Sequence, residues 1–227
     1  GTYQMHELTR QYAAEQLDPT HELYNAHAQY YAGLADRLGK ELNGPQSKEL
    51  LGQLDLIADN VTSAWNWLLL TIEQRNPHPL AAHWLAQLVA TLGEYFYMQA
   101  RFQEGLQLFK QAAERIQSVD GNAASWNNGA PPPPLVTLFA QLQLRIAVLS
   151  YDIGQYEAVQ QHIQGVLPIL QAWGNAEELA QAFCMLGKAH YRLGQRSEAR
   201  AQLYTGLEYA KMTANLLWRA VALNNLS

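Results

Sequence analysis

A short motif recurs at an offset of 40 residues in the second half of this 227-residue chain. Residues 151–155 are Tyr-Asp-Ile-Gly-Gln, and residues 191–195 are Tyr-Arg-Leu-Gly-Gln. An upstream copy covers residues 92–106, where Ala100 stands at the place of Gly154 and Gly194. The wider spacing before Gly154 is explained by an insert at 121–134, which is rich in Gly, Asn and Pro and cannot be helical. A fixed period of this size predicts stacked repeats.

Each repeat has the pattern of two amphipathic helices joined by a short turn. In the third unit, apolar residues follow a helical spacing on both sides of the turn. They are Leu179, Ala182, Phe183, Leu186 and Ala189 before it, and Ala199, Leu203, Leu207 and Ala210 after it. The small residues Ala199 and Gly206 allow close approach of the two helices, with Leu203 between them. Frequent Ala, Leu and Gln favour helix over strand along the whole chain.

Composition limits the function classes. Charged residues are 15% of the chain and the net charge is −5, so the chain lacks the excess of Lys and Arg that is typical of proteins that bind nucleic-acid phosphates. Cys184 is the only cysteine, which excludes an internal disulfide and a multi-cysteine zinc site. No run approaches ~20 apolar residues, so we expect no membrane span. The chain starts at Gly1 without a secretory pattern, and we expect a fragment of a cytoplasmic protein.

The units resemble tetratricopeptide repeats. The resemblance lies in Leu186-Gly187 early in the first helix, Tyr191 a turn later, and Ala199 and Leu203 in the second helix. It implies an all-α, right-handed superhelix of antiparallel helix hairpins over residues 77–227. The insert 121–134 is then an inter-repeat loop, and the last repeat is truncated, because residues 226–227 match only the middle of a first helix. The alternative is a generic helical bundle with chance spacing.

The front of the chain resembles a different region of a known family. Residues 3–17, from Tyr3 to Leu17, are similar to the end of a winged-helix domain in bacterial STAND-type regulators, which are signal-transducing nucleotide-binding proteins. Residues 54–61, with Ala64 and Trp67, resemble the linker that follows it there. The resemblance implies a winged-helix remnant at 1–18, a helical linker or degenerate repeat at 19–76, and a sensor built from the repeats. No phosphate-binding Gly-x-x-x-x-Gly-Lys-Ser/Thr loop is present, so ATP hydrolysis and DNA binding are not assigned to this chain.

Candidate catalytic groups do not assemble from the sequence. The seven histidines lack metal-ligand spacing, and the carboxylates are best explained as solvated helix faces. Cys184 has no identifiable base or oxyanion site, which favours an inert thiol. We therefore expect no enzyme activity, no metal and no cofactor.

Equivalent positions in the first helix of each unit form the one candidate binding site. In tetratricopeptide-like stacks, positions 2, 5, 9 and 12 line a concave groove, as the resemblance implies. Here these positions are Gln87, Ala90, Glu94 and Tyr97; Gln141, Leu144, Val148 and Tyr151; and Gln181, Cys184, Lys188 and Tyr191. Stacked Tyr and Gln suit a peptide or a small polar ligand. The alternative is that the tyrosines pack between repeats and the glutamines are solvent-facing.

The sequence thus predicts a non-catalytic module for protein interaction or signal sensing in a larger cytoplasmic regulator. Its expected partner is a protein or peptide, which includes the ATPase core of the same polypeptide, with no direct nucleic-acid or membrane binding. The alternative is a metabolite sensor that uses the same groove. A closed polar pocket favours the metabolite, and an open channel favours the peptide.

Overall fold

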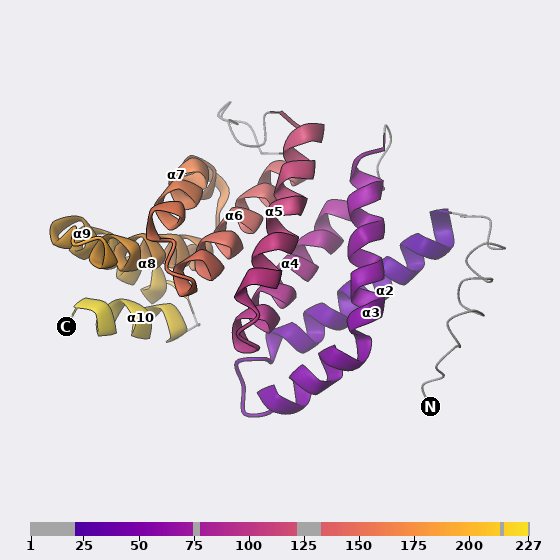
Figure 1. Ribbon diagram of the computed structural model, residues 1–227, viewed down its shortest axis with the longest axis horizontal. Helices are drawn as coiled ribbons and strands as arrows, with labels where there is room; N and C mark the ends of the chain where they lie inside the picture. Colours follow the sequence, from indigo (N-terminus) through magenta and orange to yellow (C-terminus); the bar gives the residue numbers. More distant parts are fainter. Residues whose placement is uncertain (1–20, 75–77, 122–132, 214–215, 227) are drawn as a thin grey trace.

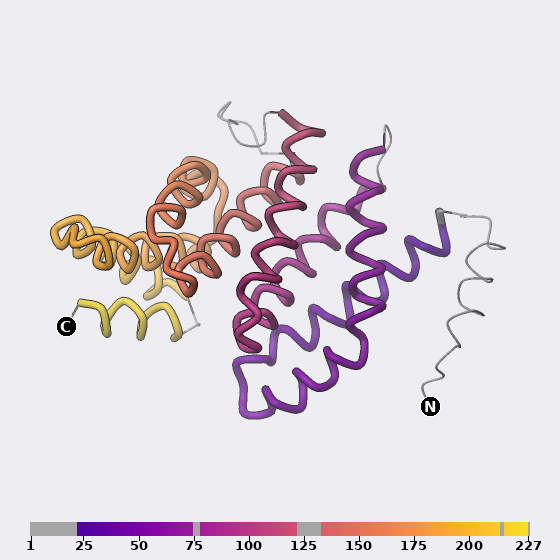
Figure 2. Tube along the Cα trace, in the orientation of Figure 1, coloured from indigo at the N-terminus to yellow at the C-terminus, as the bar shows by residue number. Residues whose placement is uncertain are grey.

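The computed structural model describes residues 21–74, 78–121, 133–213 and 216–226, which form nine helices and no strand. Figures 1 and 2 show them in sequence order from one end of the molecule to the other. The helices are α2 (His21–Lys40), α3 (Ser47–Ile72), α4 (Ala81–Met98), α5 (Phe102–Val119), α6 (Pro134–Asp152), α7 (Tyr156–Trp173), α8 (Ala176–Arg192), α9 (Arg196–Lys211) and α10 (Leu216–Leu226).

The helices form hairpins that stack in two layers. Each even-numbered helix packs against the odd-numbered helix that follows it and against the next even-numbered helix, from α2 through to α10. Among the odd-numbered helices that the structure describes, only α3 and α5 touch each other. Because one layer is continuous and the other is open, the stack curves (Figure 1). The predicted all-α superhelix of helix hairpins is confirmed.

The stack already begins in the region for which a linker or degenerate repeat was predicted. Helix α2 packs on both α3 and α4, as an even-numbered helix does elsewhere in the stack. The Thr91 hydroxyl on α4 donates a hydrogen bond of 3.1 Å to the carbonyl oxygen of Ala35 on α2. Residues 21–74 therefore form a further hairpin of the same layered arrangement.

The three turns that the repeat aligned share one hydrogen-bond pattern. The Gly154 N–H donates to the Tyr151 carbonyl and the Gln155 N–H to the Ser150 carbonyl, and the same pairs of bonds occur at Gly194 and Ala100. This closing pattern needs a left-handed residue after the helix. The φ angles are 81° at Gly154, 77° at Gly194 and 53° at Ala100. The repeat therefore marks where each first helix ends.

The close approach of α8 and α9, the hairpin of the third predicted unit, depends on glycine. A Cβ at position 187 would lie 2.5 Å from Leu203 Cγ, and one at position 206 would lie 2.7 Å from Cys184 Sγ. These distances leave no room for a side chain at either glycine. The predicted close contact of the two helices around Leu203 is confirmed.

Helix α6 is a long apolar helix within the described stack. It alone among the described helices is long and apolar enough to span a membrane by length and composition, and 56% of that stretch is buried inside the structure. It packs against α4, α5, α7 and α8. Its apolar character is that of a core helix with neighbours on several sides.

Some predictions lie outside the described residues. These are the winged-helix remnant at 1–18 and most of the insert, residues 122–132. The insert does join α5, which ends at Val119, to α6, which begins at Pro134, as the prediction of an inter-repeat loop requires. On α10, Leu216, Leu217 and Leu223 are exposed, so the apolar face of this helix is partly uncovered.

Replacing Ala100 with glycine should stabilise the fold by about 1 kcal/mol, because a left-handed conformation is costly for a residue with a Cβ. Gly194→Ala should destabilise it by a similar amount, although open space surrounds that position. Gly33→Ala, within α2 and also in open space, is the matched control and should stabilise by about 1 kcal/mol through helix propensity. Urea denaturation measures all three. Equal effects at positions 33 and 194 would contradict the assigned turn geometry.

Candidate ligand-binding cleft

Three adjoining cavities open on the face of the even-numbered helices, and we call them together the inner cleft. Their volumes are about 80, 420 and 220 Å³. Arg145 and Gln181 line all three, so the cavities adjoin one another at these two side chains. Asn43 after α2 and Trp218 on α10 line the same two cavities, although they come from opposite ends of the layer. The layer is therefore concave on this side.

The inner cleft follows the length of α4. Its lining begins at Ala86, continues at Ala90 and Glu94, and ends at Met98. At a rise of 1.5 Å per residue, this stretch of α4 is roughly 18 Å long. Helices α6 and α8 supply the facing wall over a comparable stretch, from Gln141 onward on α6.

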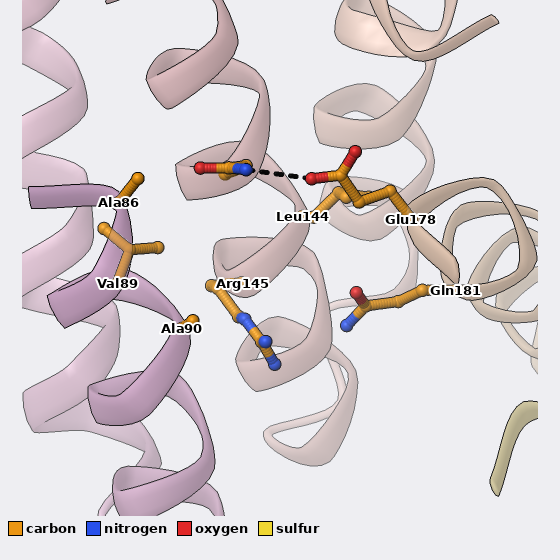
Figure 3. A pocket seen from close by; sticks show the side chains of 8 residues that line it. Ala86, Val89, Ala90, Leu144, Arg145, Glu178 and Gln181 are labelled. Atoms are coloured by element: carbon orange, nitrogen blue, oxygen red, sulfur yellow. Dashed lines mark hydrogen bonds between the residues drawn. The ribbon is translucent and has the colours of Figure 1, made fainter. Parts of the chain in front are cut away.

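Gln181 lies at the centre of the cleft. The residue is only 7% exposed, yet its carboxamide has no hydrogen-bond partner among the described residues. Figure 3 shows the carboxamide extending from α8 toward Arg145 on α6. Its two donors and one acceptor are therefore presented to whatever fills the cleft.

A partly buried ion pair lies beside Gln181. Arg145 Nη1 donates to Glu94 Oε1 at 2.6 Å, and the two side chains are 20% and 25% exposed. A Cβ at position 93 would lie 2.6 Å from Arg145 Cδ, so the glycine makes room for the arginine stem. The pair crosses from α4 to α6 and balances one positive against one negative charge within the cleft.

A second polar contact closes the cavity at the start of α6 and α8. Gln141 Nε2 donates to Glu178 Oε1 at 2.9 Å, and Figure 3 marks this bond. The Gln141 Oε1 atom is buried without a partner in the described structure. Glu178 Oε2 also accepts from the backbone N–H of Asn175, which caps α8. The capping box thereby fixes the carboxylate that orients Gln141.

The opposite end of the cleft is an apolar chamber of about 220 Å³. Half of its lining residues are apolar or aromatic side chains, which are Tyr97, Met98, Val148, Met185, Leu217, Trp218 and Val221. Helix α10 supplies three of them, so α10 covers the end of the groove. Polar groups at the centre and an apolar chamber at one end are typical of ligand-binding sites.

Four charged side chains also line this chamber, which are Glu94 and Arg145 of the ion pair together with Asp152 and Lys188. Lys188 Nζ lies 4.0 Å from the ring centroid of Tyr151, a cation–π distance. Burial lowers the pKa of Lys188, and Asp152 acts in the opposite direction. Burial raises the pKa of Asp152, and Lys188 opposes this shift. The opposite charges of Asp152 and Lys188 thus each favour the charged form of the other group.

Most of the predicted groove positions line the cleft. They are Ala90, Glu94, Tyr97, Gln141, Leu144, Val148, Gln181 and Lys188. Gln87, Tyr151, Cys184 and Tyr191 line none of its three cavities. Gln87 is half-buried on α4, one turn before Ala90.

The three repeated tyrosines are not brought into one cavity. Tyr97 lines the chamber, whereas Tyr151 packs against the ring of Tyr156 and accepts a hydrogen bond from Arg192 Nε. Tyr191 is 55% exposed and lines a separate depression between α8, α9 and α10. The structure therefore favours the alternative for Tyr151, in which it packs between neighbouring repeats.

Cys184 is buried beneath α10 rather than exposed in the cleft. It is fully buried, and its thiol donates to the carbonyl oxygen of Trp218 at 3.7 Å. Burial raises the pKa of this thiol to about 12, with Lys188 acting against the shift. A thiol with that pKa stays protonated near neutral pH and is unreactive.

Sequence reasoning missed Arg145 and the residues supplied by α10. Arg145 is adjacent to the predicted position Leu144, and a signal for it exists in Gly93, the small residue on the neighbouring helix that accommodates its stem. Trp218 and Val221 have no comparable signal, because their place in the cleft depends on the curvature of the whole stack.

Among the described residues, no group of three His, Cys, Asp or Glu side chains could hold a metal ion. No protein-family model matches the chain, and no curated protein matches it. The geometry of the cleft is therefore the main basis for a functional proposal.

Gln181→Leu should change the free energy of unfolding by less than about 1 kcal/mol, because the carboxamide that it removes makes no hydrogen bond within the described part of the chain and faces the cleft. Gln111→Leu, at an exposed position on α5, is the matched control and should change stability little. Thermal and urea denaturation measure both variants. A loss of more than about 1 kcal/mol in Gln181→Leu would show that the amide holds the fold together.

Proposed function

We propose that this chain is a non-catalytic binding module that holds an extended segment of a partner protein in the inner cleft. The observation that carries the proposal is the row of three adjoining cavities along α4, which share Arg145 and Gln181. An extended chain rises about 3.3 Å per residue, so a cleft roughly 18 Å long accommodates about five or six residues.

The resemblance at the front of the chain supports a place for this module in a STAND-type regulator, as its sensor. In the α2–α3 hairpin, the residues of that resemblance make specific contacts. Trp67 Nε1 donates to Asn25 Oδ1 at 3.0 Å, and Asp55 Oδ1 accepts a hydrogen bond from the Tyr95 hydroxyl. The partner segment then comes from another protein or from the ATPase core of the same polypeptide, and its binding changes how the module packs on that core.

A second candidate is a metabolite sensor, and the chamber beneath α10 is the observation that favours it. Trp218 and Val221 cover a space of about 220 Å³ beside polar groups. Pockets for drug-sized ligands commonly measure about 300–1,000 Å³. The chamber alone is smaller than this range, so it suits one side chain of a longer ligand better than a whole metabolite.

The two candidates differ in how affinity depends on ligand length. We expect a capped pentapeptide, Ac-Ala-Ala-X-Ala-Ala-NH2, to bind at least tenfold more tightly than Ac-X-NH2, with X as Leu, Met, Phe or Trp. The flanking residues add contacts along the cleft that the short amide cannot make. Titration followed by ¹H–¹⁵N NMR measures both, with Ac-Ala-Ala-Ala-Ala-Ala-NH2 as the control that lacks a large side chain.

Equal affinity of the long and short probes, with shifts confined to the chamber, would favour the metabolite sensor. Gln181→Leu should weaken binding of every probe, whereas Gln111→Leu should leave binding unchanged. Shifts that map to the odd-numbered helices would contradict the proposal.

A further inference from the structure

Among the described residues that line the inner cleft, carboxylates outnumber cations by five to three. The lining carboxylates are Asp36, Glu94, Asp152, Glu177 and Glu178, and the lining cations are Lys40, Arg145 and Lys188. Lys40 pairs with Asp36 at 2.6 Å, and Arg145 pairs with Glu94 at the same distance. Lys188 is linked electrostatically to Asp152. A ligand carboxylate would therefore enter a cleft in which negative charge already prevails.

The hydrogen-bonding groups at the centre fit an amide. The Gln181 carboxamide has both donors and an acceptor without partners within the described ranges. A secondary amide in a peptide main chain also has one donor and one acceptor, so the two can exchange two hydrogen bonds. A carboxylate group only accepts hydrogen bonds, so in the same place it would leave Gln181 Oε1 without a donor.

The apolar chamber lies directly beside these groups. Arg145 and Gln181 line the chamber together with Val148, Met185 and Trp218. A ligand that places its amide at Gln181 can therefore place an attached apolar side chain among these residues. Since Met is adaptable and Trp offers a large flat surface, the chamber suits branched and aromatic side chains.

We infer that the inner cleft selects an uncharged main-chain amide that carries a large apolar side chain, and that the Glu94–Arg145 pair makes it reject carboxylates. This inference rests on the proposed function and specifies the ligand of the same site. Glu94 acts here as a specificity-determining residue, because it neutralises Arg145, which on its own would attract an anion.

The test compares two probes that differ only in the C-terminal group, an uncharged amide in Ac-Leu-NH2 and a carboxylate in Ac-Leu-O⁻, by NMR titration of the whole chain. The side-chain amide of Gln181 and the indole N–H of Trp218 report binding in the cleft. In the native chain, the amide should bind at least fivefold more tightly than the acid. In Glu94→Gln, which leaves Arg145 without its carboxylate, affinity for the acid should rise at least tenfold while that for the amide changes little.

Two further variants make the comparison decisive. Arg145→Gln leaves Glu94 unpaired and should weaken acid binding further, so the two substitutions shift selectivity in opposite directions. Glu208→Gln removes the carboxylate of an exposed ion pair with Lys211 on α9 and should leave selectivity unchanged. The dispersion of the NMR spectrum establishes that each variant is folded.

The outcomes separate this inference from the proposed function. If the acid binds more tightly than the amide in the native chain and still shifts the Gln181 and Trp218 signals, the cleft is a binding site but the ligand class is wrong. Unchanged selectivity in both Glu94→Gln and Arg145→Gln overturns the role of the ion pair. If neither probe shifts those two signals at any concentration, the proposed function fails as well.

Discussion

Continuous packing of the even-numbered helices is the constraint on which the rest of the structure depends. Each hairpin buries its apolar face only against its neighbours, as in other stacked repeats. Since α2, α4, α6, α8 and α10 touch in series while the odd-numbered layer is open, the stack must curve. Curvature brings Asn43 and Trp218, from the two ends of the layer, to the same cavities. The inner cleft is thus a consequence of how the layer packs.

Within that cleft, the polar groups reduce stability and increase the capacity for recognition. The Gln141 Oε1 atom is buried without a partner in the described structure, and the Gln181 carboxamide, which makes no hydrogen bond there, faces the cleft. Apolar residues at these places would pack at lower cost, as they do along most of α6. Groups of this kind persist where binding requires them. The Glu94–Arg145 pair also serves recognition. Its two charges cancel, so Arg145 does not attract an anionic ligand by its charge alone.

Local features made the fold predictable. The 40-residue period, the turn glycines at 154 and 194 and the small residues at 199 and 206 depend on neighbouring residues, so the pattern located the hairpins. The groove positions on α4 and α6 followed from the same register. The contribution of α10 to the lining of the cleft did not follow from that register, because it depends on the accumulated curvature of several hairpins. For the same reason the contact of Cys184 with Trp218 was not foreseen, although an inert thiol was.

Direct detection of a peptide in the cleft tests the central claim, which is that the concave face of the even-numbered helices is the binding surface. Isotope-filtered NOE spectra of the labelled chain with Ac-Ala-Ala-Leu-Ala-Ala-NH2 measure which residues the peptide touches. The account predicts contacts from the leucine methyl groups to the Trp218 indole and the Val148 methyl groups, and from a peptide amide to the Gln181 side chain. Contacts confined to Leu56 on α3 or to Leu223 on α10, both exposed outside the cleft, would contradict it.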